Sequence, residues 1–236
     1  MQGRARFHGQ IAGVGSTSGV RVVIGRWDAS PLGAFADVML EQPDGHRVLL
    51  APSTAVAEFV ADTYVFDEVV VTDAAAAVTT PPTAAAAGTG PSTSAAAGTS
   101  RWAVRAAGLD LVLVVGRRAA LGRLLRAIPP PLAASPLFAA AVDPVAGAVL
   151  RGVRTRGQAR SGRREWYGAR DLHHVTSLTG SWRGTDLGTL APVDPPCRFG
   201  FSSTPRAPGV TRVVTTVQTD GGRSAVWRPA PRRAHL

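Results

Sequence analysis

The sequence contains no lysine and no asparagine, and Cys197 is the single cysteine among its 236 residues. One cysteine excludes an intramolecular disulfide and a cysteine-rich metal site. The apolar runs are broken by proline or arginine and stay well short of the roughly 20 residues that a membrane-spanning helix needs. No charged stretch followed by an apolar segment opens the chain, which argues against a secretory signal. We therefore expect a soluble, cytoplasmic protein with no membrane span.

The sequence also lacks the common motifs of nucleotide, metal and nucleophile sites. It has no P-loop, no HExxH and no nucleophile elbow, and Gly13, Gly15 and Gly19 miss the dinucleotide-binding spacing by one residue. The five histidines have no metal-ligand spacing. His173 and His174 are adjacent and point to opposite faces of a strand, so they cannot both face one metal ion. We expect neither a metal nor a cofactor.

All 26 basic residues are arginines, and they are unevenly distributed. Residues 1–100 have 5 arginines and 9 acids, and residues 101–236 have 21 and 7, so the net charges are −4 and +14 and the total is +10. The abundance of alanine, glycine and proline is typical of a high-GC coding sequence, so the choice of arginine itself carries little information. The uneven placement fits three partners: nucleic acid, an anionic ligand, or the acidic half of the chain.

Composition divides the chain into two units. Residues 74–100 hold no charged residue and few large side chains, which predicts a flexible linker or loop. This segment separates an N-terminal β-module (1–73) from a C-terminal β-module (101–220) that has a helical insertion at about 117–150. Residues 221–236, rich in proline and arginine, are expected to form a disordered tail.

Both units alternate strand patterns with one helical segment. The first has strand patterns, a hairpin turn at 43–45 and a short helix at 53–64. The second has a hairpin turn at 107–108, a helix within 117–128 and strand patterns near its C-terminal end. This order predicts an all-β, mainly antiparallel fold, namely a tandem lipocalin-like β-barrel or sandwich with short helical insertions.

Residues 151–174 hold the densest set of chemically useful side chains. On a regular strand, Glu165, Tyr167, Asp171 and His173 share one face, which gives a pocket wall with two carboxyl groups, a phenol and an imidazole. These groups can exchange protons near neutral pH, so Asp171, Glu165 and His173 are the candidate catalytic residues. A β-bulge at Gly168 would exchange the faces of the residues beyond it. The alternative is a solvated hairpin whose arginines pair with nearby acids.

The stretch "RREWYGARDL" (163–172) resembles the "RDHSWGxRDW" stretch of the lipocalin-like hydratase and cyclase superfamily, which includes carotenoid 1,2-hydratases. The positions that match are Arg163, Tyr167, Gly168, Arg170 and Asp171. The resemblance implies a two-barrel protein that encloses an apolar small molecule, with Tyr167, Trp166, Arg170 and Arg163 as candidate ligand-binding residues.

The same stretch departs from that family at positions that matter for its chemistry. Arg164 and Glu165 stand where the family has an Asp-His pair, and Leu172 replaces the closing tryptophan. The family adds water to an isoprenoid double bond, a reaction that needs a strong general acid. Asp171 or Glu165 would have to supply it here.

The sequence is therefore compatible with three functions. The first is a lipocalin-like protein that binds a small hydrophobic molecule, with acid–base chemistry on that molecule as a further expectation. The second is a non-enzymatic structural or interaction protein whose basic unit docks on its acidic unit. The third is a nucleic-acid-binding module, which the scattering of the arginines over predicted helix, hairpin and tail makes unlikely.

Overall fold

The computed structural model describes residues 3–72, 100–129, 132, 135, 138, 143, 153–158 and 162–219. The expected disordered tail at 221–236 and nearly all of the expected linker at 74–100 lie outside these described residues. The same holds for most of the expected helical insertion beyond residue 129.

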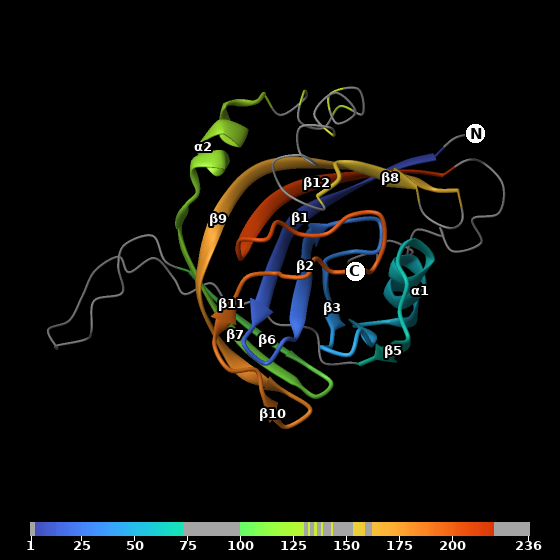
Figure 1. Ribbon diagram of the computed structural model, residues 1–236. Coiled ribbons are helices and arrows are strands. Elements are labelled where there is room, and N and C mark those ends of the chain that lie inside the picture. Colours follow the sequence, from blue (N-terminus) through green and yellow to red (C-terminus); the bar gives the residue numbers. More distant parts are fainter. Residues whose placement is uncertain are drawn as a thin grey trace, which may run out of the picture.

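The described chain is dominated by strands (Figure 1). Its N-terminal elements are β1 (Gly3–Ser16), β2 (Arg21–Ala29), β3 (Phe35–Glu41), β4 (Arg47–Ala51), α1 (Thr54–Thr63) and β5 (Glu68–Val71). Its later elements are β6 (Ser100–Ala106), β7 (Leu109–Arg118), α2 (Ala120–Ala127), β8 (Arg156–Gln158), β9 (Arg164–Trp182), β10 (Thr185–Asp186), β11 (Leu190–Ala191) and β12 (Gly209–Thr219). The all-β, mainly antiparallel class with short helical insertions is confirmed.

All of these strands belong to one sheet, whose main path runs β5-β4-β3-β2-β1-β12-β9-β7-β6. The first strand of the chain pairs with the last, from Gly3↔Thr219 to Gly13↔Gly209. Only the β4–β5 pair is parallel among the described ladders. The two units of the sequence therefore contribute to a single sheet, and residues 72–99 connect its two outermost strands.

Ion pairs also join the two halves of the sequence. Arginines of the basic half pair with acids of the acidic half in Arg163–Asp62 (3.0 Å), Arg198–Glu41 (2.9 Å) and Arg183–Glu68. Some arginines of the basic half are thus paired with acids of the acidic half within the fold.

Local sequence explains the turns and the first helix. The tight turns use glycine in the left-handed region, with φ of 91° at Gly45 and 76° at Gly108. Ser53 caps α1 by accepting a hydrogen bond from the backbone N–H of Val56 at 3.3 Å. The predicted turns at 43–45 and 107–108 and the predicted helix at 53–64 are confirmed.

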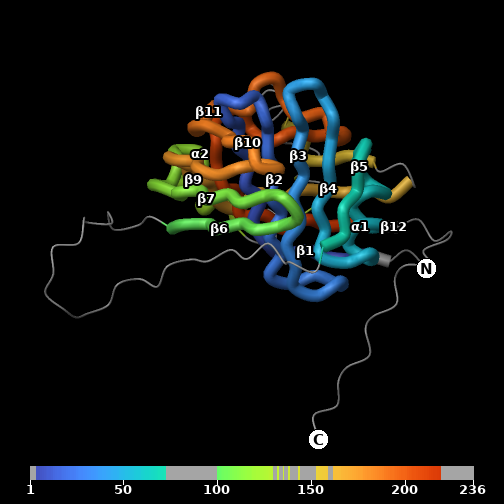
Figure 2. The backbone as a smooth tube through the Cα atoms, turned by 90° about the horizontal axis from the view of Figure 1, so that it is seen from below, coloured from blue at the N-terminus to red at the C-terminus, as the bar shows by residue number. Residues whose placement is uncertain are grey.

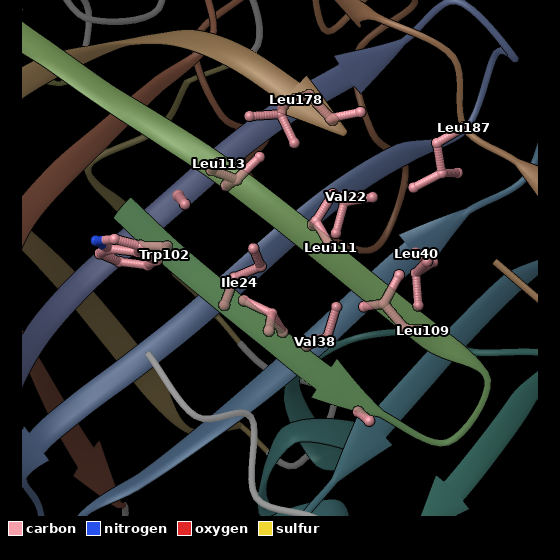
Figure 3. Close-up of a cluster of buried hydrophobic side chains, with 14 of the residues drawn as sticks. Val22, Ile24, Val38, Leu40, Trp102, Leu109, Leu111, Leu113, Leu178 and Leu187 are labelled. Carbon is pink, nitrogen blue, oxygen red and sulfur yellow. The ribbon is translucent and has the colours of Figure 1, made fainter. Parts of the chain in front are cut away.

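The main hydrophobic core lies on one face of strands β1 to β4. The β6–β7 hairpin crosses over this face (Figures 2 and 3), and Val22, Ile24 and Val38 pack there against Trp102 and Leu111. The C-terminal half of β9 joins the same core through residues such as Leu178. Because side chains alternate along a strand, the opposite face of β1 to β3 is left for other elements to cover.

Candidate functional site

A pocket of about 590 Å³ lies on that opposite face. Its floor is formed by β1, β2, β3, β12 and the N-terminal half of β9, and its walls include side chains of α1, α2 and the segment 197–205. Most of the lining is apolar, with residues such as Phe7, Met39, Phe59, Leu125 and Val213. This size and composition are those of a small-molecule site.

The register of the strands places the floor residues in rows. One row runs across five strands through Asp37, Gly25, Ile11, Thr211 and Leu172, which are directly cross-strand partners and all line the pocket. The glycine in this row has no side chain to fill the space above it. Its absent Cβ would lie 2.4 Å from Asp37 Oδ1, so this position leaves room for the carboxyl group.

A β-bulge in β9 decides which of the predicted residues reach the pocket. Arg212 of β12 pairs with Asp171, but the next residue, Val213, pairs with Ala169, so Arg170 is the extra residue. Glu165 and Tyr167 line the pocket, and beyond the bulge Leu172 does so instead of Asp171 and His173. The expectation for a regular strand, with all four polar residues on one face, is therefore wrong. The bulge occurs two residues beyond the glycine at which the sequence allowed one.

Asp37 is the carboxyl group of the pocket lining that has no described cationic side chain paired with it. It is 4% exposed, its Oδ1 accepts a hydrogen bond from the indole N–H of Trp27 at 3.0 Å, and it has no ion pair within the described ranges. Burial raises the pKa of Asp37 from 3.8 to about 7, against the smaller lowering effect of the Trp27 hydrogen bond. Near neutral pH this side chain can hold or release a proton.

A second polar group of the pocket wall is built around Glu165, which is 3% exposed. It accepts hydrogen bonds from Thr63 at 2.8 Å, from Tyr167 at 3.1 Å and from Arg163 Nε at 3.2 Å. Arg163 also donates to the Phe59 carbonyl of α1 at 2.9 Å, and its guanidinium lies 4.1 Å from the centre of the Phe59 ring. This Arg163–Glu165 network ties β9 to α1.

The two tyrosines extend the network into the pocket. The hydroxyl of Tyr167 is hydrogen-bonded to that of Tyr64, the residue that ends α1. Burial raises the pKa of both phenols above its ordinary value, and the nearby Glu165 carboxylate adds to the effect. Both therefore stay protonated and serve as hydrogen-bond donors.

Asp171 and His173 form a separate cluster with Arg118. Arg118 Nε donates to the two carboxylate oxygens of Asp171 at 2.8 and 3.0 Å, and His173 Nε2 lies 3.6 Å from Asp171 Oδ2. Burial opposes ionisation, but the hydrogen bonds from Arg118 and from the Leu172 N–H outweigh it and lower the pKa of Asp171. An ionised carboxylate paired with arginine is a poor proton donor.

The remaining predicted residues lie away from the pocket. Trp166 lines a second, more polar depression of about 540 Å³ with Arg154, Arg156 and Arg164. Arg170 does not line the pocket and has no ion pair in the described part of the chain. Of the four predicted ligand-binding residues, only Tyr167 lines the pocket. Arg163 contacts the pocket residue Glu165 but does not line the pocket itself.

No family model, curated protein or solved structure matched this chain. Its function is therefore argued from its own residues.

The segment 197–205 that covers one side of the pocket is held by a buried carboxylate. Glu41, fully buried, accepts from the Arg198 backbone N–H at 2.7 Å and from its Nε at 2.9 Å, and it pairs with Arg21 at 3.2 Å. Burial raises the pKa of the neighbouring Cys197 thiol to about 12, so it stays protonated and is a poor nucleophile.

Some pocket hydroxyls lack a protein partner. The Oγ1 atoms of Thr204 and Thr215 are buried and have no hydrogen bond to any described residue. Both residues line the pocket. Buried hydroxyls are usually satisfied, so these two are exceptions in the pocket wall.

The described residues contain neither a membrane-spanning helix nor a cluster of metal-binding side chains. Neither helix in the described ranges has the length and apolar composition needed to cross a lipid bilayer. Within the same residues, no three side chains among histidine, cysteine, aspartate and glutamate are grouped so that they could hold a metal ion.

The sequence reasoning missed three polar residues that the pocket uses, Asp37, Trp27 and Tyr64, all from the first unit. A signal for the first exists in the strand "FADVMLE", where Val38 and Leu40 occupy one face and Phe35 and Met39 the other. A strand that is apolar on both faces is buried on both, so a carboxyl group within it is costly unless it has a use.

Proposed function

We propose that this protein binds a small, mainly apolar molecule in the pocket between the sheet, α1, α2 and the segment 197–205. The observation that carries the proposal is the pocket of about 590 Å³ with its mainly apolar lining, because small-molecule sites typically have this size and composition. The polar groups of the lining are few. The Tyr167 hydroxyl donates to Glu165 and the Tyr64 hydroxyl donates to Tyr167, so protonated Asp37 is the one of these groups that is left to donate to a ligand. It favours a ligand with a neutral acceptor such as a hydroxyl or carbonyl oxygen.

We further propose that Asp37 is the acid of any reaction in this pocket. The resemblance of residues 163–172 to the hydratase and cyclase superfamily suggests water addition to a carbon–carbon double bond. In that reaction the Asp37 carboxyl group would give its proton to one carbon. Water would then bond to the other carbon and return a proton to the carboxylate, which balances the step. Asp171 is ionised and lies outside the pocket, so it does not fit this role.

Filling the pocket is expected to abolish ligand binding. Ala169 lies on the floor, so Ala169→Trp would place an indole where the ligand sits, and the affinity for the neutral probe N-phenyl-1-naphthylamine should fall at least about a hundredfold. The control is Val69→Trp on β5, a half-exposed position outside the pocket, which should leave affinity unchanged. Fluorescence titration measures both, and urea midpoints verify that both variants are folded. Equal binding by wild type and Ala169→Trp would refute the proposal.

Binding of a neutral ligand is expected to weaken as the pH rises through 7. An apolar ligand such as farnesol removes water from Asp37, which favours its protonated form. If farnesol raises the pKa of Asp37 by about one pH unit, affinity falls up to roughly tenfold between pH 6 and pH 9. Isothermal titration across this range measures the effect, and Asp37→Asn should bind with the same affinity at both ends. A pH-independent wild-type affinity would remove Asp37 from the site.

A further inference from the structure

We infer that α2 and the residues around it form a docking surface for an anionic lipid membrane at the edge of the pocket. The inference rests on the proposed function, because it names the source from which an apolar ligand would enter. It is carried by three observations: the position of α2, the exposure of its leucines and the charge of the surrounding segment.

The position of α2 joins the surface to the pocket. Leu121, Leu125 and Ile128 line the pocket, and α2 lies beside β9, away from α1 (Figure 1). A Cβ at Gly122 would lie 2.3 Å from the carbonyl oxygen of Leu172, so the helix packs closely on the strand at this glycine. The backbone N–H of Ala119 donates to the same carbonyl at 2.9 Å. One side of α2 is therefore fixed over the pocket.

Two apolar side chains of this region are exposed. Leu124 is 65% exposed and Leu132 is 45% exposed, and the only other exposed large hydrophobic residues in the described ranges are Val69 and Val71 of β5. Singly exposed leucines are common, but Leu124 also touches the pocket. Its side chain thus connects the pocket lining with the outer surface.

The sequence segment that contains these leucines has charge of one sign. Residues 111–142 contain four arginines and no acidic residue. Arg118 pairs with Asp171, whereas the exposed Arg117, Arg123 and Arg126 have no ion pair among the described residues. Arginines flanking exposed leucines on a short helix are typical of segments that lie in the interface of an anionic membrane. A nucleic acid would use the arginines but would leave the leucines without a role.

Vesicle co-sedimentation of the full chain tests the inference. Wild type should bind vesicles of phosphatidylserine and phosphatidylcholine in equal parts at least about tenfold more tightly than pure phosphatidylcholine vesicles. Arg123→Glu with Arg126→Glu should lose at least about tenfold on the mixed vesicles, since each arginine near an anionic surface contributes several-fold. Leu132→Ser, outside the pocket lining, should lose roughly fivefold because it no longer buries an apolar side chain.

The matched control is Arg101→Glu with Arg105→Glu on β6, which changes the net charge equally at two exposed positions away from α2. This variant should bind the mixed vesicles within about twofold of wild type if the site is local. The inference would be overturned by an equal loss of binding in this control, or by a wild-type protein with no preference for phosphatidylserine. It would also be overturned by tight binding to a DNA duplex that Leu132→Ser leaves unchanged. Titration with N-phenyl-1-naphthylamine without vesicles should give wild-type affinity in both arginine variants. If the wild-type protein itself did not bind N-phenyl-1-naphthylamine, that result would instead refute the proposed function.

Discussion

Asp37→Asn is expected to remove a decline in stability that the wild-type protein shows as the pH rises from 4 to 8. The folded-state pKa of Asp37 is about 7 and its ordinary value is 3.8, so between these values the folded protein binds a proton that the unfolded chain releases. The contribution of Asp37 to the free energy of unfolding is therefore greatest below pH 4 and falls as the pH rises through 7. The fall amounts to about 4 kcal/mol at about 1.4 kcal/mol per pH unit.

Urea unfolding at pH 5 and pH 8 measures this effect. The asparagine variant keeps the acceptor for Trp27 but has no charge to bury, so above pH 7 it should be more stable than wild type. The gain is reduced by about 1–3 kcal/mol if the new amide N–H groups find no partner. The control is Asp28→Asn at a half-exposed position, which should keep the wild-type pH dependence. If Asp37→Asn also keeps the wild-type pH dependence of stability, Asp37 is not the group whose protonation causes it.

Arg163→Met is expected to destabilise the protein by about 3–5 kcal/mol, because it leaves Glu165 as a buried carboxylate without its cation. The side chains of this pair are only 8% and 4% exposed. Replacing both members, as in Arg163→Met with Glu165→Leu, should restore most of the loss, to within about 1–2 kcal/mol of wild type, since no charge then needs burial. The double variant would lose the hydrogen bond from Tyr167.

A double-mutant cycle by urea unfolding gives the coupling energy of the pair. The comparison is Arg105→Met at the exposed Arg105–Asp110 pair, where the side chains are 77% and 56% exposed and the loss should be below about 1 kcal/mol. Additive losses at Arg163 and Glu165 would mean that the two side chains do not act as a pair, and the link between β9 and α1 would need another explanation.

Local patterns in the sequence were sufficient to predict two hairpin turns and the first helix. The turns at 43–45 and 107–108 have glycines that supply the required positive φ, and the α1 cap at Ser53 follows from residue type alone. The pairing of β1 with β12 could not be predicted in this way, because it joins residues 196 to 216 positions apart. No local signal marks which distant strands become neighbours.

The contents of the pocket were only partly predictable for a similar reason. Alternation placed Glu165 and Tyr167 on one face correctly, but the extra residue at Arg170 reversed the faces of Asp171 and His173. An arginine has no feature that marks a bulge, whereas the glycine at 168 is regular in its pairing with Val214. The acid that does reach the pocket, Asp37, comes from the other half of the sequence, and only the folded sheet brings it near Tyr64 and Tyr167.

The central claim is that the pocket holds one small apolar molecule, and native mass spectrometry of the full chain with added farnesol tests it most directly. Wild type is predicted to gain the mass of a single farnesol at low ligand excess, and Ala169→Trp is predicted to stay ligand-free under the same conditions. A ligand-free wild-type spectrum, or the same adduct on both proteins, would contradict the account.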